Sequence, residues 1–121
     1  MQITARTNSN STILDINGRL VMGGSLTELR NAVHDATGKQ PEKLILNLAN
    51  VTYVDSCGIG ELITAFKHVR SRGGRLVLTN LPRRVRILLD TAQLMKVFEV
   101  ADDEQLVMAK PKQQMQQQFC R

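Results

Sequence analysis

The chain has 121 residues, 42% of them hydrophobic and 22% charged, with a formal net charge of +5. This length suits one domain with its own apolar core, and the composition excludes an intrinsically disordered chain. The positive charge is compatible with a polyanion or with an acidic protein partner. Three Phe, one Tyr and no Trp leave little for stacking on bases, which argues against single-stranded nucleic acid and RNA as ligands.

Nothing in the sequence indicates a membrane segment or a bound metal. No apolar run approaches the roughly 18 residues that span a bilayer, and the first residues lack the basic-then-apolar order of a secretory signal. The two cysteines, Cys57 and Cys120, lie far apart and fit neither a disulfide scaffold nor a metal-binding spacing. We therefore expect a cytoplasmic protein without membrane insertion, metal or cofactor.

The first half of the chain predicts two strands, a helix and a third strand. Short apolar segments on either side of the turn-prone TNSNS predict a strand pair over residues 1–22. Ser25 and Glu28 have the spacing of a reciprocally capped helix start, and Gly38 marks the end of that helix. The apolar stripe of the helix consists of Leu26, Leu29, Val33 and Ala36. The apolar run KLILNLANV is typical of a central strand covered on both faces.

The second half predicts helices alternating with strands. Helical spacing runs over residues 58–71 and stops at RGG. The inner face of this helix consists of Ile59, Leu62, Ile63, Phe66 and Val69. RLVLTNL predicts a strand, after which Pro82 begins a third helix. The inward residues of the third helix are expected to be Val85, Leu88 and Leu89. DTAQLMKVFEV predicts a turn, a brief helix and an edge strand, and DDEQLVMAK a last short helix.

This alternation implies parallel strand pairing with right-handed crossovers. We therefore expect a single small α/β domain over residues 1–110, with a mixed, mostly parallel sheet of four to five strands and about four helices. The glutamine-rich remainder, residues 111–121, has nothing periodic to bury and is expected to be a disordered polar tail.

The junction VDSCGIG, where a strand ends and a helix begins at once, is the strongest candidate site. Ligands and partners of open α/β sheets usually meet the carboxyl ends of the strands, where Asp55 and Ser56 lie. Ser56 would be an exposed hydroxyl beside the free N–H groups of a helix start, which attract anions. Gly58 and Gly60 would let another surface approach the backbone. The alternative is that Ser56 merely caps the helix.

Catalytic interpretations of the junction fail on detail. The pattern is not G-x-S-x-G, and neither His34 nor His68 is placed to take a proton from Ser56. A glutamate rather than a lysine follows Gly60, so the P-loop pattern is not met. Cys57 could be a redox thiol, but a small residue that fits the turn is the simpler interpretation. No catalytic residue and no enzymatic activity are expected.

The motif D-S-C-G-I-G at residues 55–60 resembles the STAS domain, and most closely the stand-alone anti-sigma factor antagonists of bacteria. INGRL, RSRGGRLVLTNL and LLDTAQLMKVFEV support the likeness, which covers roughly residues 10–108. The resemblance implies that Ser56 is phosphorylated by an anti-sigma factor that is also a serine kinase. It also implies that the unphosphorylated form binds this partner and frees a sigma factor for transcription, and that a serine phosphatase resets the switch.

The resemblance also implies which residues meet the partner. These are Asp55, Ser56, Cys57, Gly58, Ile59 and Gly60, together with Met22, Gly23 and Gly24 in the loop after the second strand. That loop departs from the family, because Val21 and Met22 stand where many relatives carry an acidic or hydroxyl residue.

Other functions remain open at this stage. One is a cytoplasmic STAS subunit of a membrane transporter, and another is a basic nucleic-acid-binding module. A basic set around the end of the second helix and the start of the third is either a solvated face or a binding patch. It consists of Lys67, Arg70, Arg72, Arg75, Arg83, Arg84 and Arg86. A monomer or weak dimer is expected, with the edge strand near residues 98–101 free to pair.

Overall fold

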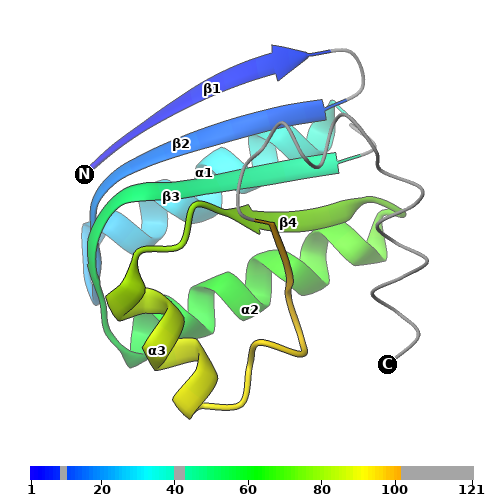
Figure 1. Cartoon of the computed structure of the whole chain (residues 1–121). Coiled ribbons are helices and arrows are strands. Elements are labelled where there is room, and N and C mark those ends of the chain that lie inside the picture. Colours follow the sequence, from blue (N-terminus) through cyan, green and yellow to red (C-terminus); the bar gives the residue numbers. More distant parts are fainter. Residues whose placement is uncertain (9–10, 40–42, 102–121) are drawn as a thin grey trace.

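The computed structural model describes residues 1–8, 11–39 and 43–101, which form one five-stranded sheet with helices packed on it (Figure 1). The strands lie in the order β1-β2-β3-β4-β5; β1 pairs antiparallel with β2, and all the other pairs are parallel. The strands are β1 (Gln2–Asn8), β2 (Ser11–Leu20), β3 (Lys43–Val54), β4 (Arg75–Thr79) and β5 (Glu99–Ala101). The helices are α1 (Gly24–Gly38), α2 (Ser56–Ser71) and α3 (Arg83–Thr91). The expected α/β class and mostly parallel sheet are confirmed.

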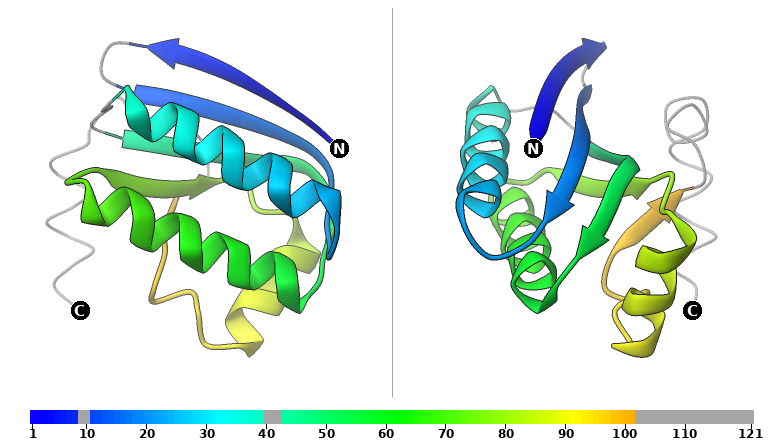
Figure 2. Two further views of the ribbon diagram at one scale, coloured as in Figure 1. Left: turned by 180° about the vertical axis from the view of Figure 1, so that it is seen from behind. Right: turned by 90° about the vertical axis from the view of Figure 1, so that its left-hand side faces the viewer.

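Two helices cover one face of the sheet. α1 and α2 lie side by side against it, each crossing from the end of one strand to the start of the next (Figure 2). Alternate residues of the strands point into this layer, which forms the main core. Its largest fully buried strand side chains are Leu14, Ile16, Leu20, Leu44, Leu46, Leu48 and Leu78. β3 is the central strand, as its continuous apolar run predicts.

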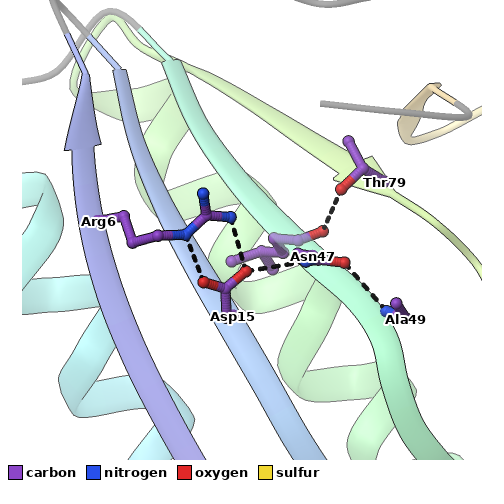
Figure 3. A network of polar contacts seen from close by, with 6 residues as sticks. Arg6, Asp15, Asn47, Ala49 and Thr79 are labelled. Atoms are coloured by element: carbon purple, nitrogen blue, oxygen red, sulfur yellow. Dashed lines mark hydrogen bonds and ion pairs between the residues drawn. The ribbon is translucent and has the colours of Figure 1, made fainter. Parts of the chain in front are cut away.

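The opposite face of the sheet is divided into an apolar and a polar part. Ile13, Ile45 and Val77 form a small buried cluster. Further along the strands, Asp15 accepts a hydrogen bond from Arg6 of β1 at 2.9 Å and one from Asn47 of β3 at 2.8 Å (Figure 3). The Arg6 guanidinium, helped by the Asn47 amide, holds the pKa of Asp15 below its usual range. This polar row links three neighbouring strands in one register.

The start of α1 differs from the prediction. Ser25 and Glu28 do not form a capping box, because the helix begins at Gly24 and Ser25 lies within its first turn. The Ser25 hydroxyl instead donates to the carbonyl oxygen of Val21 at 2.8 Å. Gly23 takes the N-cap position with φ of 123°, a conformation that other residues rarely adopt. The loop therefore depends on glycine rather than on a side-chain cap.

The region after β4 holds two further differences. Val85 and Leu89 of α3 are buried as expected, but Leu88 is 36% exposed, because this nine-residue helix buries one narrow stripe. The brief helix predicted after α3 is wrong: residues 92–98 form turns, with Gln93 at φ of 61°. The edge strand that follows is confirmed as β5. The described residues contain three helices, and the predicted last helix and polar tail lie outside them.

Candidate functional site

Asp55 organises the junction between β3 and α2. It is the N-cap of α2, and its Oδ1 accepts a hydrogen bond from the backbone N–H of Gly58 at 2.8 Å. Its Oδ2 accepts one from the backbone N–H of Met22 at 3.0 Å, across 33 positions of sequence. Donation from Met22 and then from Gly58 holds the pKa of the Asp55 carboxyl below its usual range. One ionised carboxylate thus joins the start of α2 to the loop after β2.

Ser56 is the first residue of α2 and is exposed. Its hydroxyl makes no hydrogen bond with any residue that the structure describes. The capping alternative is therefore wrong, because Asp55 does the capping and leaves Ser56 free. The site offers an accessible hydroxyl at the positive end of a 16-residue helix.

The two glycines of the junction have different roles. Gly58 is buried against the end of β2, and a β-carbon there would overlap the carbonyl oxygen of Leu20. Gly60 is exposed, and a β-carbon there would meet nothing within 4 Å. The fold therefore requires glycine at position 58, whereas Gly60 leaves the helix backbone exposed to solvent.

The remaining residues of the predicted set flank this turn. Cys57 is a half-buried free thiol, and Ile59 is half-buried against the main core. Met22 is 72% exposed, and Gly23 and Gly24 beside it are also exposed. The predicted residues of both segments thus come together at the carboxyl edge of the sheet, through the Met22–Asp55 hydrogen bond. Sequence reasoning missed that bond, since no local pattern marks it.

Both histidines lie away from the serine. His34 of α1 and His68 of α2 lie against each other in the seam between the two helices. His68 is twelve residues along α2 from Ser56, which corresponds to about 18 Å of helix. Neither imidazole is placed to take a proton from Ser56. Within the described ranges, no group of three or more His, Cys, Asp or Glu side chains could hold a metal ion.

The basic residues do not form one patch. Lys67, Arg70 and Arg72 lie at the end of α2, and Arg83 and Arg84 at the start of α3. β4 begins after the end of α2, and α3 follows the end of β4, so the two groups lie toward opposite ends of the molecule (Figure 1). Arg75 is also engaged, since its Nη2 lies 2.6 Å from Oε1 of Glu99. A single extended polyanion site is not supported by this arrangement.

α3 adds exposed apolar surface at the same end of the molecule as the start of α2 (Figures 1 and 2). Ile87 is 51% exposed and Leu88 36% exposed. Met22, at the loop after β2, is the most exposed large apolar side chain of the described residues. The segments that follow β2, β3 and β4 therefore meet at the carboxyl ends of these strands. Together they present the Ser56 hydroxyl, the exposed backbone at Gly60, and the exposed apolar side chains of Met22 and Ile87.

This fold and site define a small α/β domain that presents an exposed serine at a helix start. The STAS domain family matches residues 2–107, and the chain belongs to that family. In the part of the chain that the structure describes, no helix is long and apolar enough to cross a membrane.

Among curated relatives, the chain is similar to an anti-sigma F factor antagonist of Paenibacillus polymyxa, with 30% identity over 54% of this chain and 56% of the relative. It is also similar to an anti-sigma-B factor antagonist of Bacillus subtilis, with 35% identity over 52% of this chain and 58% of the relative. The match thus spans little more than half the length of each of these relatives.

Three solved structures share the fold. A Thermotoga maritima protein described as a candidate anti-sigma factor antagonist gives a TM-score of 0.81 at 22% identity, covering 89% of this chain and 92% of that one. The phosphorylated form of the Bacillus cell fate determinant SpoIIAA gives 0.68 at 16% identity, covering 89% and 98%. A sulfate transporter family protein from Wolinella succinogenes gives 0.69 at 21% identity, covering 78% and 79%.

Proposed function

We propose that this protein is a cytoplasmic anti-sigma factor antagonist whose binding is switched by phosphorylation of Ser56. The unphosphorylated protein binds an anti-sigma factor that is also a serine kinase, and so frees a sigma factor for transcription. The kinase then phosphorylates Ser56 and is released, and a serine phosphatase restores the binding form. The names of the relatives and the phosphorylated Bacillus fold neighbour support this assignment.

The observation that carries the proposal is the free hydroxyl of Ser56 at the exposed start of α2. A phosphate there adds about −1.5 to −2 charge at neutral pH. The helix dipole favours negative charge at this place, so the fold tolerates it. Phosphorylation therefore changes the docking surface and leaves the fold intact. A loss of about 1.4 kcal/mol in binding already weakens affinity tenfold.

The surface around Ser56 suits a partner with an apolar centre and an acidic rim. Met22 and Ile87 supply exposed apolar side chains, and Gly60 leaves room for close approach to the helix. Arg83 and Arg84 add exposed positive charge in the first turn of α3. A phosphate placed in this surface would repel an acidic partner and add bulk where the two surfaces meet.

The test compares four proteins as bait in lysate of the source cells, with bound proteins identified by mass spectrometry. Wild type and Ser56→Ala should both recover an anti-sigma factor kinase, and Ser56→Asp should not. Ser71→Asp is the matched control, because Ser71 is an exposed serine at the far end of the same helix. It should bind like wild type.

A phosphorylation assay completes the test. With the recovered kinase and labelled ATP, wild type should accept phosphate and Ser56→Ala should not. Equal labelling of both would contradict the assignment of Ser56. Recovery of a membrane transporter by wild type and Ser56→Asp alike would favour the transporter-subunit alternative, for which the Wolinella fold neighbour is the precedent.

A further inference from the structure

The two edges of the sheet are protected to different degrees. β5 is only three residues long, and its Glu99 is bound to Arg75 of β4. β1 is seven residues long and contains no proline. Its one charged residue, Arg6, is bound within the sheet to Asp15. Short length, free charge and proline are the usual devices that stop an edge strand from pairing, and β1 lacks them all.

A groove runs along β1 on the helix-covered side of the sheet. The helix layer leaves a hollow of about 160 Å³ between β1 and α1, lined mainly by small or aliphatic side chains. These include Ile3, Ala5, Leu14, Ala32 and Ala36. A wider, open depression continues it toward the start of β1. An extended segment added to the edge would therefore place alternate side chains over an apolar floor.

The rim of the groove carries Glu28 at one end, Asp35 between, and Lys39 at the other end, so its two ends differ in charge. α1 runs in the same direction as β1, so Glu28 lies beside the first residues of β1 and Lys39 beside the last. Both side chains are exposed. If β1 of a second copy lay antiparallel beside β1 of the first, Glu28 of one copy would lie toward Lys39 of the other. A parallel copy would oppose like charges instead.

We propose that the outer edge of β1 pairs antiparallel with β1 of a second copy of this chain, joining two five-stranded sheets into one. The two-fold axis passes near Ala5, the central small residue of the groove face. Each carboxyl edge, with its Ser56, stays open, and the two sites face opposite ends of the joined sheet. An interface of this kind falls below about 1,200 Å² and dissociates on dilution.

The test is sedimentation of the purified chain across a concentration series. The weight-average mass of wild type should rise from one chain toward two. Ala5→Lys and Ala5→Glu should each stay monomeric, because like charges meet across the axis. An equimolar mixture of the two variants should recover the dimer, since the facing charges are then opposite. Ala5 is exposed, so both variants should keep the wild-type circular dichroism spectrum.

Thr91→Lys and Thr91→Glu serve as matched controls, because Thr91 is exposed at the end of α3 and away from β1. Both should dimerise like wild type. The proposal is overturned if wild type stays monomeric throughout, if either Ala5 variant dimerises normally, or if the mixture remains monomeric. Ser56→Asp should dimerise like wild type. A failure of the β1 dimer can therefore be distinguished from a failure of the proposed phosphorylation switch.

Discussion

The imidazole rings of His34 and His68 lie face to face across the seam between α1 and α2, with centroids 4.1 Å apart and an angle of 8° between planes. Burial, then the nearby charges of His34 and Arg72, lower the pKa of His68. Across the same seam, Arg30 donates to the buried Glu61, with Nη2 2.8 Å from Oε1. The two helices thus meet through one attractive ion pair and one stacked pair of imidazoles, of which His68 has a lowered pKa.

This arrangement predicts acid sensitivity in a narrow window. Because the folded pKa of His68 lies below the unfolded value of about 6.5, the unfolded chain binds the proton first. The neutral His68 therefore contributes to the free energy of unfolding above about pH 6.5. This contribution is lost as the pH falls from there through the lower pKa of the folded state. The thermal midpoint should fall as the pH drops below about 6.5, and His68→Gln should reduce the fall. An unchanged pH profile in His68→Gln would contradict this account.

Two glycine substitutions in one helical turn should have opposite effects. Gly58→Ala forces a β-carbon into the Leu20 carbonyl oxygen and to within 2.9 Å of Val54, and should destabilise by about 3 kcal/mol. Gly60→Ala meets open space and removes glycine from a helix, so it should stabilise by about 1 kcal/mol. Urea unfolding measures both. If the partner approaches Gly60 closely, the stabilised variant should bind more weakly.

The Asp55 carboxylate should control the loop after β2 as well as α2. Asp55→Ala removes the acceptor for the N–H groups of both Met22 and Gly58, and hydrogen exchange at these two amides should accelerate. The depressed pKa of Asp55 means that its contribution persists above about pH 4 and disappears only as pH falls through the folded value. Asp90→Ala, at an exposed position on α3, should leave both amides unchanged. Acceleration at only one amide would show that the carboxylate does not join the two segments.

Adjacent apolar residues on α3 should separate stability from binding. Leu89 is fully buried, and Leu89→Ala should cost about 3 kcal/mol of unfolding free energy. Ile87 is half exposed, and Ile87→Ala should change stability by no more than about 0.5 kcal/mol. Ile87→Ala should nevertheless weaken binding of the proposed partner, as titration calorimetry would show. Full affinity in this variant would remove α3 from the docking surface.

Most of the helices and strands could be predicted from short-range patterns. Each of the long helices and inner strands has apolar residues at the spacing typical of its own type of secondary structure. Leu88 shows where such patterns fail: the spacing of three residues from Val85 suits burial, but the described residues leave Leu88 36% exposed. Ser25 fails for another reason: the capping pattern is present, but Gly23 takes the N-cap position two residues before Ser25.

The candidate site was partly predictable for the same reason. Asp55, Ser56 and Gly58 lie within four consecutive residues, and their motif marks a helix start at a strand end. The hydrogen bond from Met22 to Asp55 spans 33 positions and exists only once β2 and β3 pair in parallel. The distinct roles of Gly58 and Gly60 likewise depend on what the fold places beside each of them.

Because Asp55 and Gly58 carry the structural demands of the turn, substitutions at position 56 should be neutral for folding. Chains with Ser, Thr, Ala or Asp at position 56 should be equally abundant in a cell, and selection would distinguish them only by what they bind. A lineage could therefore silence the site, fix it in one state or restore it by single substitutions, without passing through a misfolded ancestor.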